Sequence, residues 1–294
     1  MKALSEWLLS RRYRAVFGVV MTSLLFQGSS GALLALVTLA RGLREGLLVA
    51  SLSLLAVLAA FVALGVQPEA VLATMLTAWV PIMALAILLG LRGSLALVVQ
   101  VAVLLVAAVV TLIVLSLGDP TVFWRSMFDD QVIPWMNDNG LPVRVSGEAL
   151  DALALQMTGF AAGIAMLLTL AHLFLARWMQ SLVERPGGFG AEYHDLRMGL
   201  VVGVLAGLAF TLNAIVNVAI VQNVAWVFIA AFYLQGLAVV HSIVATLDAG
   251  RVWLVVLYVF MALQFPIVAV LLAGLGFVDN WTDLRARVRR TSDD

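Results

Sequence analysis

A stretch of 50 residues without a charged side chain is the feature that most limits how this chain can fold. Residues 198–247 contain no Lys, Arg, Asp or Glu. The hydrocarbon core of a bilayer is about 30 Å thick and takes roughly 20 mainly apolar residues per helix, so this stretch is long enough for two successive crossings. We therefore expect an integral membrane protein, with the lipid bilayer as the solvent around most of the chain.

The overall composition agrees with that expectation. Hydrophobic residues make up 63% of the chain and charged residues 12%, with a mean hydropathy of +1.08, whereas about a quarter of a soluble domain is charged. The apolar runs are long and do not alternate, which favours helices over strands. Because 17 basic and 17 acidic residues cancel, no global field points to nucleic acid as a partner. The chain has no cysteine, which excludes disulfides and thiolate metal sites.

Eight charge-free runs are candidates for membrane spans. We therefore predict an all-α fold, a polytopic transmembrane helical bundle that forms a single membrane domain over residues 1–294. An acidic extramembrane link, residues 119–151, separates spans four and five, and a polar C-terminal tail covers residues 279–294. The eight runs are residues 15–40, 47–65, 70–90, 93–118, 152–176, 199–221, 224–246 and 252–278.

The first run leaves the orientation of the chain open. It indicates an uncleaved anchor, because the apolar region of a cleaved signal peptide is only about 7 to 15 residues long. A break at Gly28–Gly31 would instead divide it into two short membrane-inserted halves. With eight straight crossings the basic residues divide ten against seven between the two sides, and with a broken first run they divide 11 against six. Neither margin is decisive under the positive-inside rule, although we favour cytoplasmic tails, and the side of the acidic link stays open.

The eight runs contain no side chain suited to driving transport. None includes Asp, Glu, Lys or Arg, so the acid relay of a proton-coupled pump is not expected. The chain also has no P-loop sequence, no His-Glu-x-x-His and no Gly-x-Ser-x-Gly. We therefore expect a protein that is not an enzyme and uses no cofactor or metal. A membrane enzyme that uses His172 or His241 is the least favoured alternative.

Small residues four apart occur on two of the predicted spans. One span carries Gly159 and Gly163, and a later one carries Gly199, Gly203 and Gly207. This spacing lets one helix backbone approach another closely in lipid. Packing within the bundle is the favoured interpretation, docking of a second membrane protein is the functional alternative, and the sequence does not separate the two.

A few polar and aromatic residues within the spans are candidates for binding a small molecule. Asn213 and Asn217 share a helix face, as do Trp226 and Tyr233. His241 is an ionisable residue at membrane depth, which is by default a functional candidate. Together these five predict a pocket in which a few polar groups stand beside an aromatic wall. The alternative is hydrogen bonding between helices without any ligand.

Four segments of the chain carry a resemblance to a known family. They are Pro186-Gly-Gly-Phe-Gly-Ala-Glu-Tyr-His-Asp-Leu-Arg197, Gly236-Leu-Ala-Val-Val-His241, Trp253-Leu-Val-Val-Leu-Tyr258 and Leu275-Gly-Phe-Val-Asp-Asn-Trp-Thr-Asp-Leu-Arg285. With them the chain resembles the YybS-like family, uncharacterised bacterial inner-membrane proteins grouped as a domain of unknown function. The resemblance implies a multi-pass protein of the bacterial inner membrane.

The same resemblance implies a class of function. The YybS-like family is distantly similar to the substrate-binding subunits of energy-coupling-factor transporters, which lack their own ATPase and dock on a transmembrane partner. We therefore predict a substrate-binding component for small-solute uptake, which depends on another membrane protein for energy. The alternative is a membrane scaffold or accessory subunit of a larger complex. The eight predicted spans exceed the six usual in the vitamin-binding subunits, which weighs against transferring their pocket to this chain.

Overall fold

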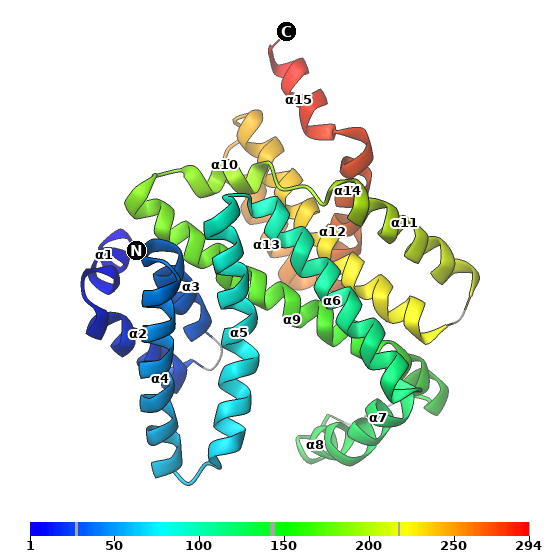
Figure 1. The fold of residues 1–294 in the computed structure, drawn as a ribbon. Helices are drawn as coiled ribbons and strands as arrows, with labels where there is room; N and C mark the ends of the chain where they lie inside the picture. The colour runs from blue at the N-terminus through cyan, green and yellow to red at the C-terminus, as the bar shows by residue number, and fades with distance from the viewer. Residues whose placement is uncertain (27–28, 142–144, 217, 294) are drawn as a thin grey trace. The chain divides into compact units, whose positions relative to one another are not determined.

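The computed structural model describes residues 1–26, 29–141, 145–216 and 218–293 of the chain. Throughout these ranges the regular structure is helical, so the predicted all-α fold is confirmed (Figure 1). In the described part of the chain, six helices are long and apolar enough to cross a membrane, or seven if α10 (Gly188–His194) and α11 (Gly199–Ile215) form one bent span. The six are α4 (Leu43–Ala63), α5 (Pro68–Arg92), α6 (Leu95–Leu117), α9 (Gly147–Glu184), α12 (Ala219–Thr246) and α14 (Phe265–Thr282).

Two of the eight predicted runs are divided into pairs of helices. The first run, residues 15–40, becomes α2 (Arg12–Leu25) and α3 (Ser30–Arg41), so the structure selects the broken form of this run. The last run, residues 252–278, becomes α13 (Val252–Leu263) and α14. Between them Gln264 has a non-helical backbone, with φ −138° and ψ 46°. Pro266 follows in the first turn of α14, where its missing N–H is tolerated, because the first amides of a helix have no partner within it.

The chain divides into two compact units. Unit 1 comprises Met1–Val99 and Leu168–Leu196, and unit 2 comprises Gln100–Leu167 and Arg197–Asp294. Helices α6 and α9 each contribute residues to both units.

In unit 1, α2 and α3 fold back on each other as a helical hairpin. The start of α2 is tied to the start of α4 by Arg12 and Glu45, whose Nη2 and Oε1 atoms are 2.6 Å apart. Arg41, at the end of α3, donates a hydrogen bond to the carbonyl oxygen of Leu9, which precedes α2. The start of α2 and the end of α3, which are the two open ends of the hairpin, therefore lie close together. With 14 and 12 residues, each arm is shorter than the roughly 20 residues that a crossing needs.

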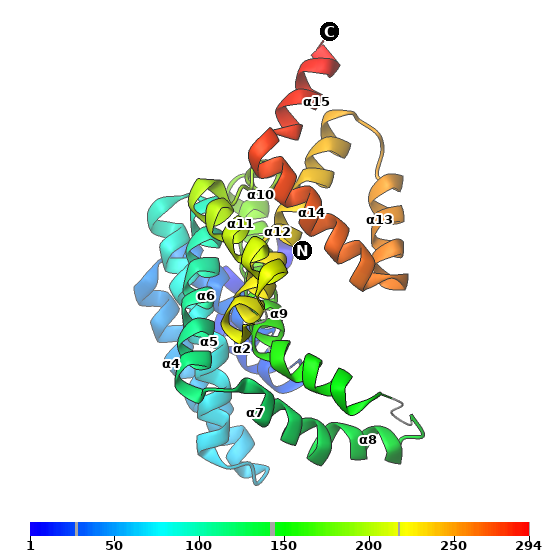
Figure 2. The same ribbon diagram turned by 90° about the vertical axis from the view of Figure 1, so that its right-hand side faces the viewer.

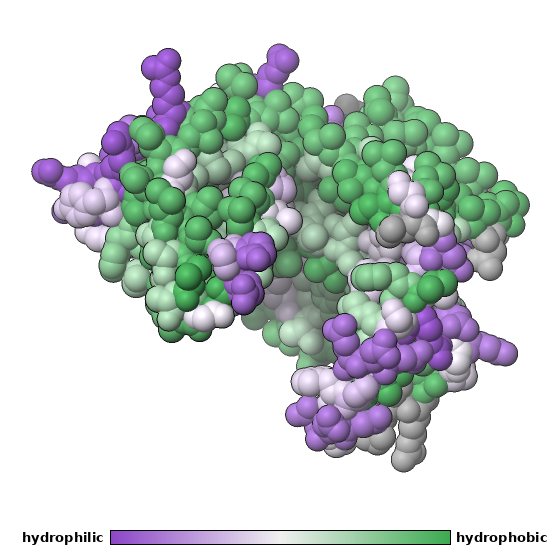
Figure 3. Space-filling model, turned by 60° about the horizontal axis from the view of Figure 1, so that its bottom comes forward, coloured by the Kyte–Doolittle hydropathy of each residue, from purple (hydrophilic) through white to green (hydrophobic). Residues whose placement is uncertain are grey.

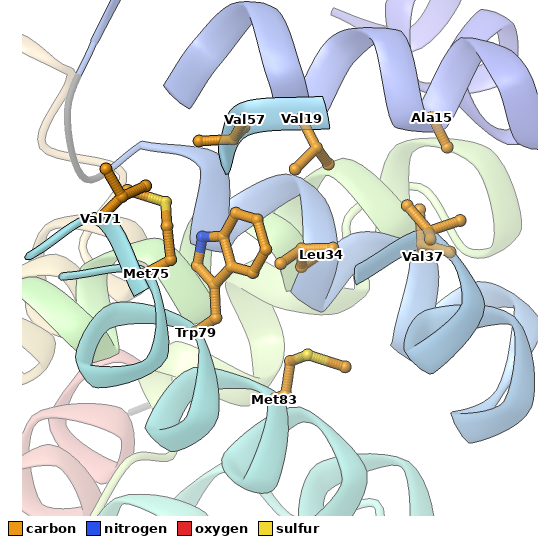
Figure 4. Packing of buried hydrophobic residues seen from close by; sticks show 10 residues of the cluster. Ala15, Val19, Leu34, Val37, Val57, Val71, Met75, Trp79 and Met83 are labelled. Carbon is orange, nitrogen blue, oxygen red and sulfur yellow. The ribbon is translucent and has the colours of Figure 1, made fainter. Parts of the chain in front are cut away.

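The core of unit 1 fixes this hairpin against α5. Val19 of α2 and Leu34 of α3 are buried beside Trp79 of α5 (Figure 4). The indole Nε1 of Trp79 donates to Ser30 Oγ at 3.0 Å. A buried donor without a partner would cost about 1–3 kcal/mol, so this bond lets a tryptophan fill the core next to the helix break.

In unit 2, α12 crosses α14 with the two backbones in direct contact. A methyl group on Gly236 would overlap the carbonyl oxygen of Leu272, and one on Gly276 would overlap that of Phe232. Helices α13 and α14 lie side by side as a second hairpin, joined at Gln264 (Figure 2). Helix α11 packs on both α12 and α14.

The predicted acidic link is helical over most of its length. It forms α7 (Pro120–Met127), the π-helical turn η1 (Phe128–Val132) and α8 (Ile133–Asp138), and its last residues already belong to α9. Arg125 joins the link to the start of α9, with its guanidinium 2.9 Å from Asp129 and 3.1 Å from Asp151. Most of its remaining acidic side chains are exposed.

Large apolar side chains are exposed on many of the long helices. Helix α13 has no buried residue at all among its described positions, and Leu55 of α4 is 66% exposed. Figure 3 shows hydrophobic residues over much of the face in view, with hydrophilic residues gathered in separate patches. Such surfaces suit contact with lipid, and the chain is accordingly a multi-pass membrane protein.

Candidate functional site

One face of α12 carries two of the predicted ligand-binding residues. Tyr233 and His241 lie about two turns apart on this helix, and both face the α13–α14 hairpin. The hydroxyl of Tyr258 in α13 is 3.1 Å from His241 Nε2. The ring of Phe265, at the start of α14, lies 6.2 Å from the ring of Tyr233 between centroids. The structure therefore brings these two candidates together along the hairpin.

The imidazole of His241 is held in a defined orientation. Its Nδ1 is 2.8 Å from the carbonyl oxygen of Leu237. Because a carbonyl oxygen only accepts, Nδ1 carries a hydrogen, and in the neutral ring Nε2 accepts from the Tyr258 hydroxyl. The ring is half-buried. This arrangement presents an imidazole and a phenol for hydrogen bonding between α12 and the hairpin.

A buried ion pair secures the far end of the hairpin. Arg285 Nη2 lies 2.8 Å from Asp279 Oδ2, and the two residues are 3% and 0% exposed. Gln235 of α12 donates from Nε2 to the same carboxylate at 3.1 Å, and its Oε1 accepts from the backbone N–H of Met198 at 2.8 Å. One set of side chains thus connects α12, α14 and the start of α11.

Sequence reasoning placed Asp279 in the polar tail, and the structure corrects this. Helix α14 continues to Thr282, so Asp279 lies inside it and is fully buried. Its partner Arg285 follows Asp283, whose φ of 51° turns the chain between α14 and α15 (Leu284–Asp293). The Asp279–Arg285 pair therefore does not have the three- or four-residue spacing of side chains that meet on one helix. The available signal was an Asp at the end of a charge-free run with an Arg soon after it.

The start of α11 is capped by side chains from other helices. Asn280 accepts from the backbone N–H of Gly199 at 3.0 Å and donates to its carbonyl oxygen at 3.1 Å. Gln100 of α6 donates to the carbonyl oxygen of Arg197 at 2.9 Å. The first amides of a helix have no partner within it, so the bond from the Gly199 N–H to Asn280 satisfies a group that would otherwise be costly in lipid. The Arg197 guanidinium pairs with Asp283 and holds the pKa of that carboxyl below its usual value.

The four segments that carry the family resemblance meet in pairs, one pair at the polar network around Asp279 and the other at the face of α12 that carries His241. The segments ending at Arg197 and Arg285 contribute to the polar network. The segments ending at His241 and Tyr258 meet in their last residues at the face of α12.

The other predicted ligand-binding residues do not join this site. Asn213 is exposed near the end of α11, and Asn217 lies outside the described residues. Trp226 donates from Nε1 to Gln156 Oε1 of α9 at 2.9 Å. Asn223, which lies between the predicted runs 199–221 and 224–246, is buried inside α12 and accepts from a backbone N–H of α9 at 2.6 Å. Trp226 and Asn223 thus connect helices of unit 2.

Both glycine rows contact other helices of unit 2. Gly159 and Gly163 of α9 lie against the backbone of α12, where a methyl group on Gly159 would overlap a carbonyl oxygen. Gly203 and Gly207 of α11 face side chains of α14. Gly199 has a φ of 71°, a backbone conformation that favours glycine. Packing within the bundle accounts for these contacts, and docking of a partner on the same residues stays a prediction.

A separate hollow in unit 2 is apolar. It measures about 380 Å³, lies among α6, α11 and α12, and is lined by aliphatic side chains and Phe228, with a hydroxyl from Thr111. None of the five predicted ligand-binding residues lines it. Across the described ranges, no three His, Asp or Glu side chains gather as metal ligands. The hollow suits hydrocarbon better than a polar solute.

Three comparisons with known proteins found no match to this chain. No model of a known protein family matches the chain. No curated protein matches it. No solved structure matches it. The geometry defines the class as a multi-pass α-helical membrane protein with two helical hairpins, and membership of the YybS-like family stays a prediction.

Proposed function

We propose that this chain is a solute-binding component of an uptake system in the bacterial inner membrane, with its site between α12 and the α13–α14 hairpin. The observation that carries the proposal is an interrupted apolar segment lying beside hydrogen-bonding groups. Non-helical backbone at membrane depth is tolerated where protein buries it or where it lines a cavity. Discontinuous helices of this kind form the binding sites of many transporters.

The side chains at this face indicate a chemical class of solute. Tyr233 and Phe265 offer ring surfaces, and His241 and Tyr258 offer hydrogen-bonding groups. These four residues provide no formal charge while His241 is neutral. A charged solute would lack a counter-charge from them and would pay a large desolvation cost. An uncharged, ring-containing solute with hydrogen-bonding groups fits best.

The hairpin has one secured arm and one loosely packed arm. Helix α14 is held by the Asp279–Arg285 pair and by its crossing with α12. Helix α13 buries none of its described side chains. Movement of α13 away from α12 would break the contact between His241 and Tyr258 and open the face to a solute. Segments with few buried contacts are the ones that move most readily.

Re-entrant insertion of both hairpins would also give the chain a strongly asymmetric distribution of charge. If neither hairpin crosses, the chain crosses six times, through α4, α5, α6, α9, α11 and α12, and both tails lie on one side. Of the 17 Lys and Arg residues, only Arg125 and Arg144 then fall on the opposite side, in the link from α6 to α9. The positive-inside rule therefore favours cytoplasmic tails and an external acidic link. Six crossings also equal the number usual in vitamin-binding subunits, and without a P-loop the energy would come from a partner.

A ligand screen on the purified protein tests this proposal. Thermal unfolding in detergent is followed with a panel of uncharged, ring-containing metabolites, because a ligand at 100 times its dissociation constant adds about 2.7 kcal/mol of stability. We expect stabilisation by one class of compound and its loss in His241→Ala. The control Asn213→Ala changes an exposed residue of α11 and should keep the effect. No stabilisation by any compound, together with stoichiometric co-purification of one large membrane assembly, would contradict a binding subunit and favour the accessory subunit.

A further inference from the structure

We infer that unit 1 holds a binding site for the headgroup of an anionic phospholipid, at the open end of the α2–α3 hairpin. A hollow of about 740 Å³ lies there, and Arg11, Arg12 and Arg41 are among the residues that line it. Ser10 and Tyr13 belong to the same lining. This inference does not depend on solute binding by unit 2.

The charge of the hollow is positive after its internal pairing is counted. Arg12 is engaged by Glu45 through two hydrogen bonds, of 2.6 and 3.1 Å. Arg41 uses one Nη2 donor on the carbonyl oxygen of Leu9, a neutral group. Arg11 is exposed. The hollow thus has three arginines in its lining and one carboxylate, that of Glu45, paired with Arg12. The planar fork of Arg matches the oxygens of a phosphate diester.

The apolar part of the lining lies farther along α2 and α4 than Arg12 and its partner Glu45. Val16 and Leu52 complete the lining. Trp7 and Phe17 pack edge to face 6.4 Å apart and are 40% and 55% exposed. The guanidinium of Arg14 lies 5.5 Å from the centre of the Trp7 ring. Aromatic rings with arginine beside them are typical of the headgroup level of a bilayer.

This combination identifies a lipid as the occupant. A soluble anion would use the guanidinium groups but would leave the apolar end in contact with water. A zwitterionic lipid would bring an ammonium group toward three arginines. An anionic phospholipid satisfies both ends, because its phosphate meets the arginines and its acyl chains continue over Val16 and Leu52. Basic pockets between membrane helices bind anionic headgroups in this way.

Native mass spectrometry of the purified full chain tests the inference. The probes are phosphatidylglycerol and phosphatidylcholine, added separately at low salt. We expect phosphatidylglycerol to be retained preferentially. One basic residue near an anionic surface is worth about fivefold in affinity, so Arg11→Gln should weaken retention about fivefold and Arg11→Gln/Arg41→Gln about 30-fold. Thermal unfolding of each variant verifies that it is folded. If the double variant does not fold, Arg11→Gln alone carries the test, because its side chain is exposed.

A matched control distinguishes binding at this hollow from a general effect of removing positive charge. Arg92→Gln/Arg251→Gln removes two exposed arginines outside this hollow and should leave phosphatidylglycerol retention unchanged. Equal retention of the two lipids would overturn the inference, as would an equal loss in the control variant. Competition by inorganic phosphate as effective as competition by phosphatidylglycerol would also overturn it, because it would show a soluble-anion site.

Discussion

Neutralising Asp279 should destabilise the protein by about 3–5 kcal/mol, the usual cost of breaking a buried ion pair by changing one partner. Asp279 and Arg285 are 0% and 3% exposed, with their closest nitrogen and oxygen atoms 2.8 Å apart. In Asp279→Asn the guanidinium keeps its charge in a site that excludes water and loses the carboxylate opposite it. Gln235 keeps a hydrogen-bonding group in reach, which places the expected cost nearer the lower end of this range.

Unfolding in mixed micelles with a rising fraction of denaturing detergent, followed by circular dichroism, measures this cost. The double variant Asp279→Asn/Arg285→Gln removes both charges and should recover most of the lost stability. Arg197→Gln is the control, because the Arg197–Asp283 pair is 38% and 45% exposed in its side chains and such pairs contribute about 1 kcal/mol or less. The reasoning is refuted if Asp279→Asn costs no more than this control, or if the double variant is less stable than both single variants.

Three further predictions use other contacts of the fold. Gly276→Ala should destabilise the protein by about 1–3 kcal/mol through overpacking at the α12–α14 crossing. The control Gly274→Ala places a methyl group in open space and should be neutral or stabilise the protein by up to about 1 kcal/mol through helix propensity. Equal effects of the two substitutions in the same unfolding assay would contradict the close crossing. Trp79→Phe should cost about 1–3 kcal/mol by removing the indole donor from its buried hydroxyl partner, and unchanged stability would show that this bond is not needed. The Arg197 guanidinium lowers the pKa of Asp283, so the stability from that pair is present above the ordinary carboxyl pKa and is lost as the pH falls below about 4; an acid unfolding curve that Asp283→Asn leaves unchanged would contradict it.

The spans were predictable because charge and turn residues mark the ends of membrane helices. Helix α5 begins at Pro68, which lies between two predicted runs, and is followed by Gly93, which has a φ of 64° and is the first residue of the next run. The two hairpins were harder to predict. A break such as the one at Gln264 leaves the run free of charge, so hydropathy reads one continuous span where the chain turns back.

The candidate site was predictable only in part, for a related reason. The depth of His241 in its span and the aromatic character of Tyr233 are visible in the sequence, and both residues lie at the site. Tyr258 reaches His241 because α13 and α14 form a hairpin beside α12, which no local pattern encodes. The polar network was missed because Asp279 and Arg285 are brought together by a turn at Asp283, where helical spacing no longer applies.

A cysteine-accessibility map tests the central claim that two hairpins enter the membrane and return. The chain has no native cysteine, so single cysteines at Lys2, Gln67, Asn139, Asp248 and Val288 report without background, with a maleimide that does not cross membranes. We predict labelling at Gln67 and Asn139 in intact spheroplasts, and at Lys2, Asp248 and Val288 only in inverted vesicles. Labelling of Lys2 and Gln67 from the same side, or of Asp248 and Val288 from opposite sides, would show a hairpin to be a crossing span and would contradict the account.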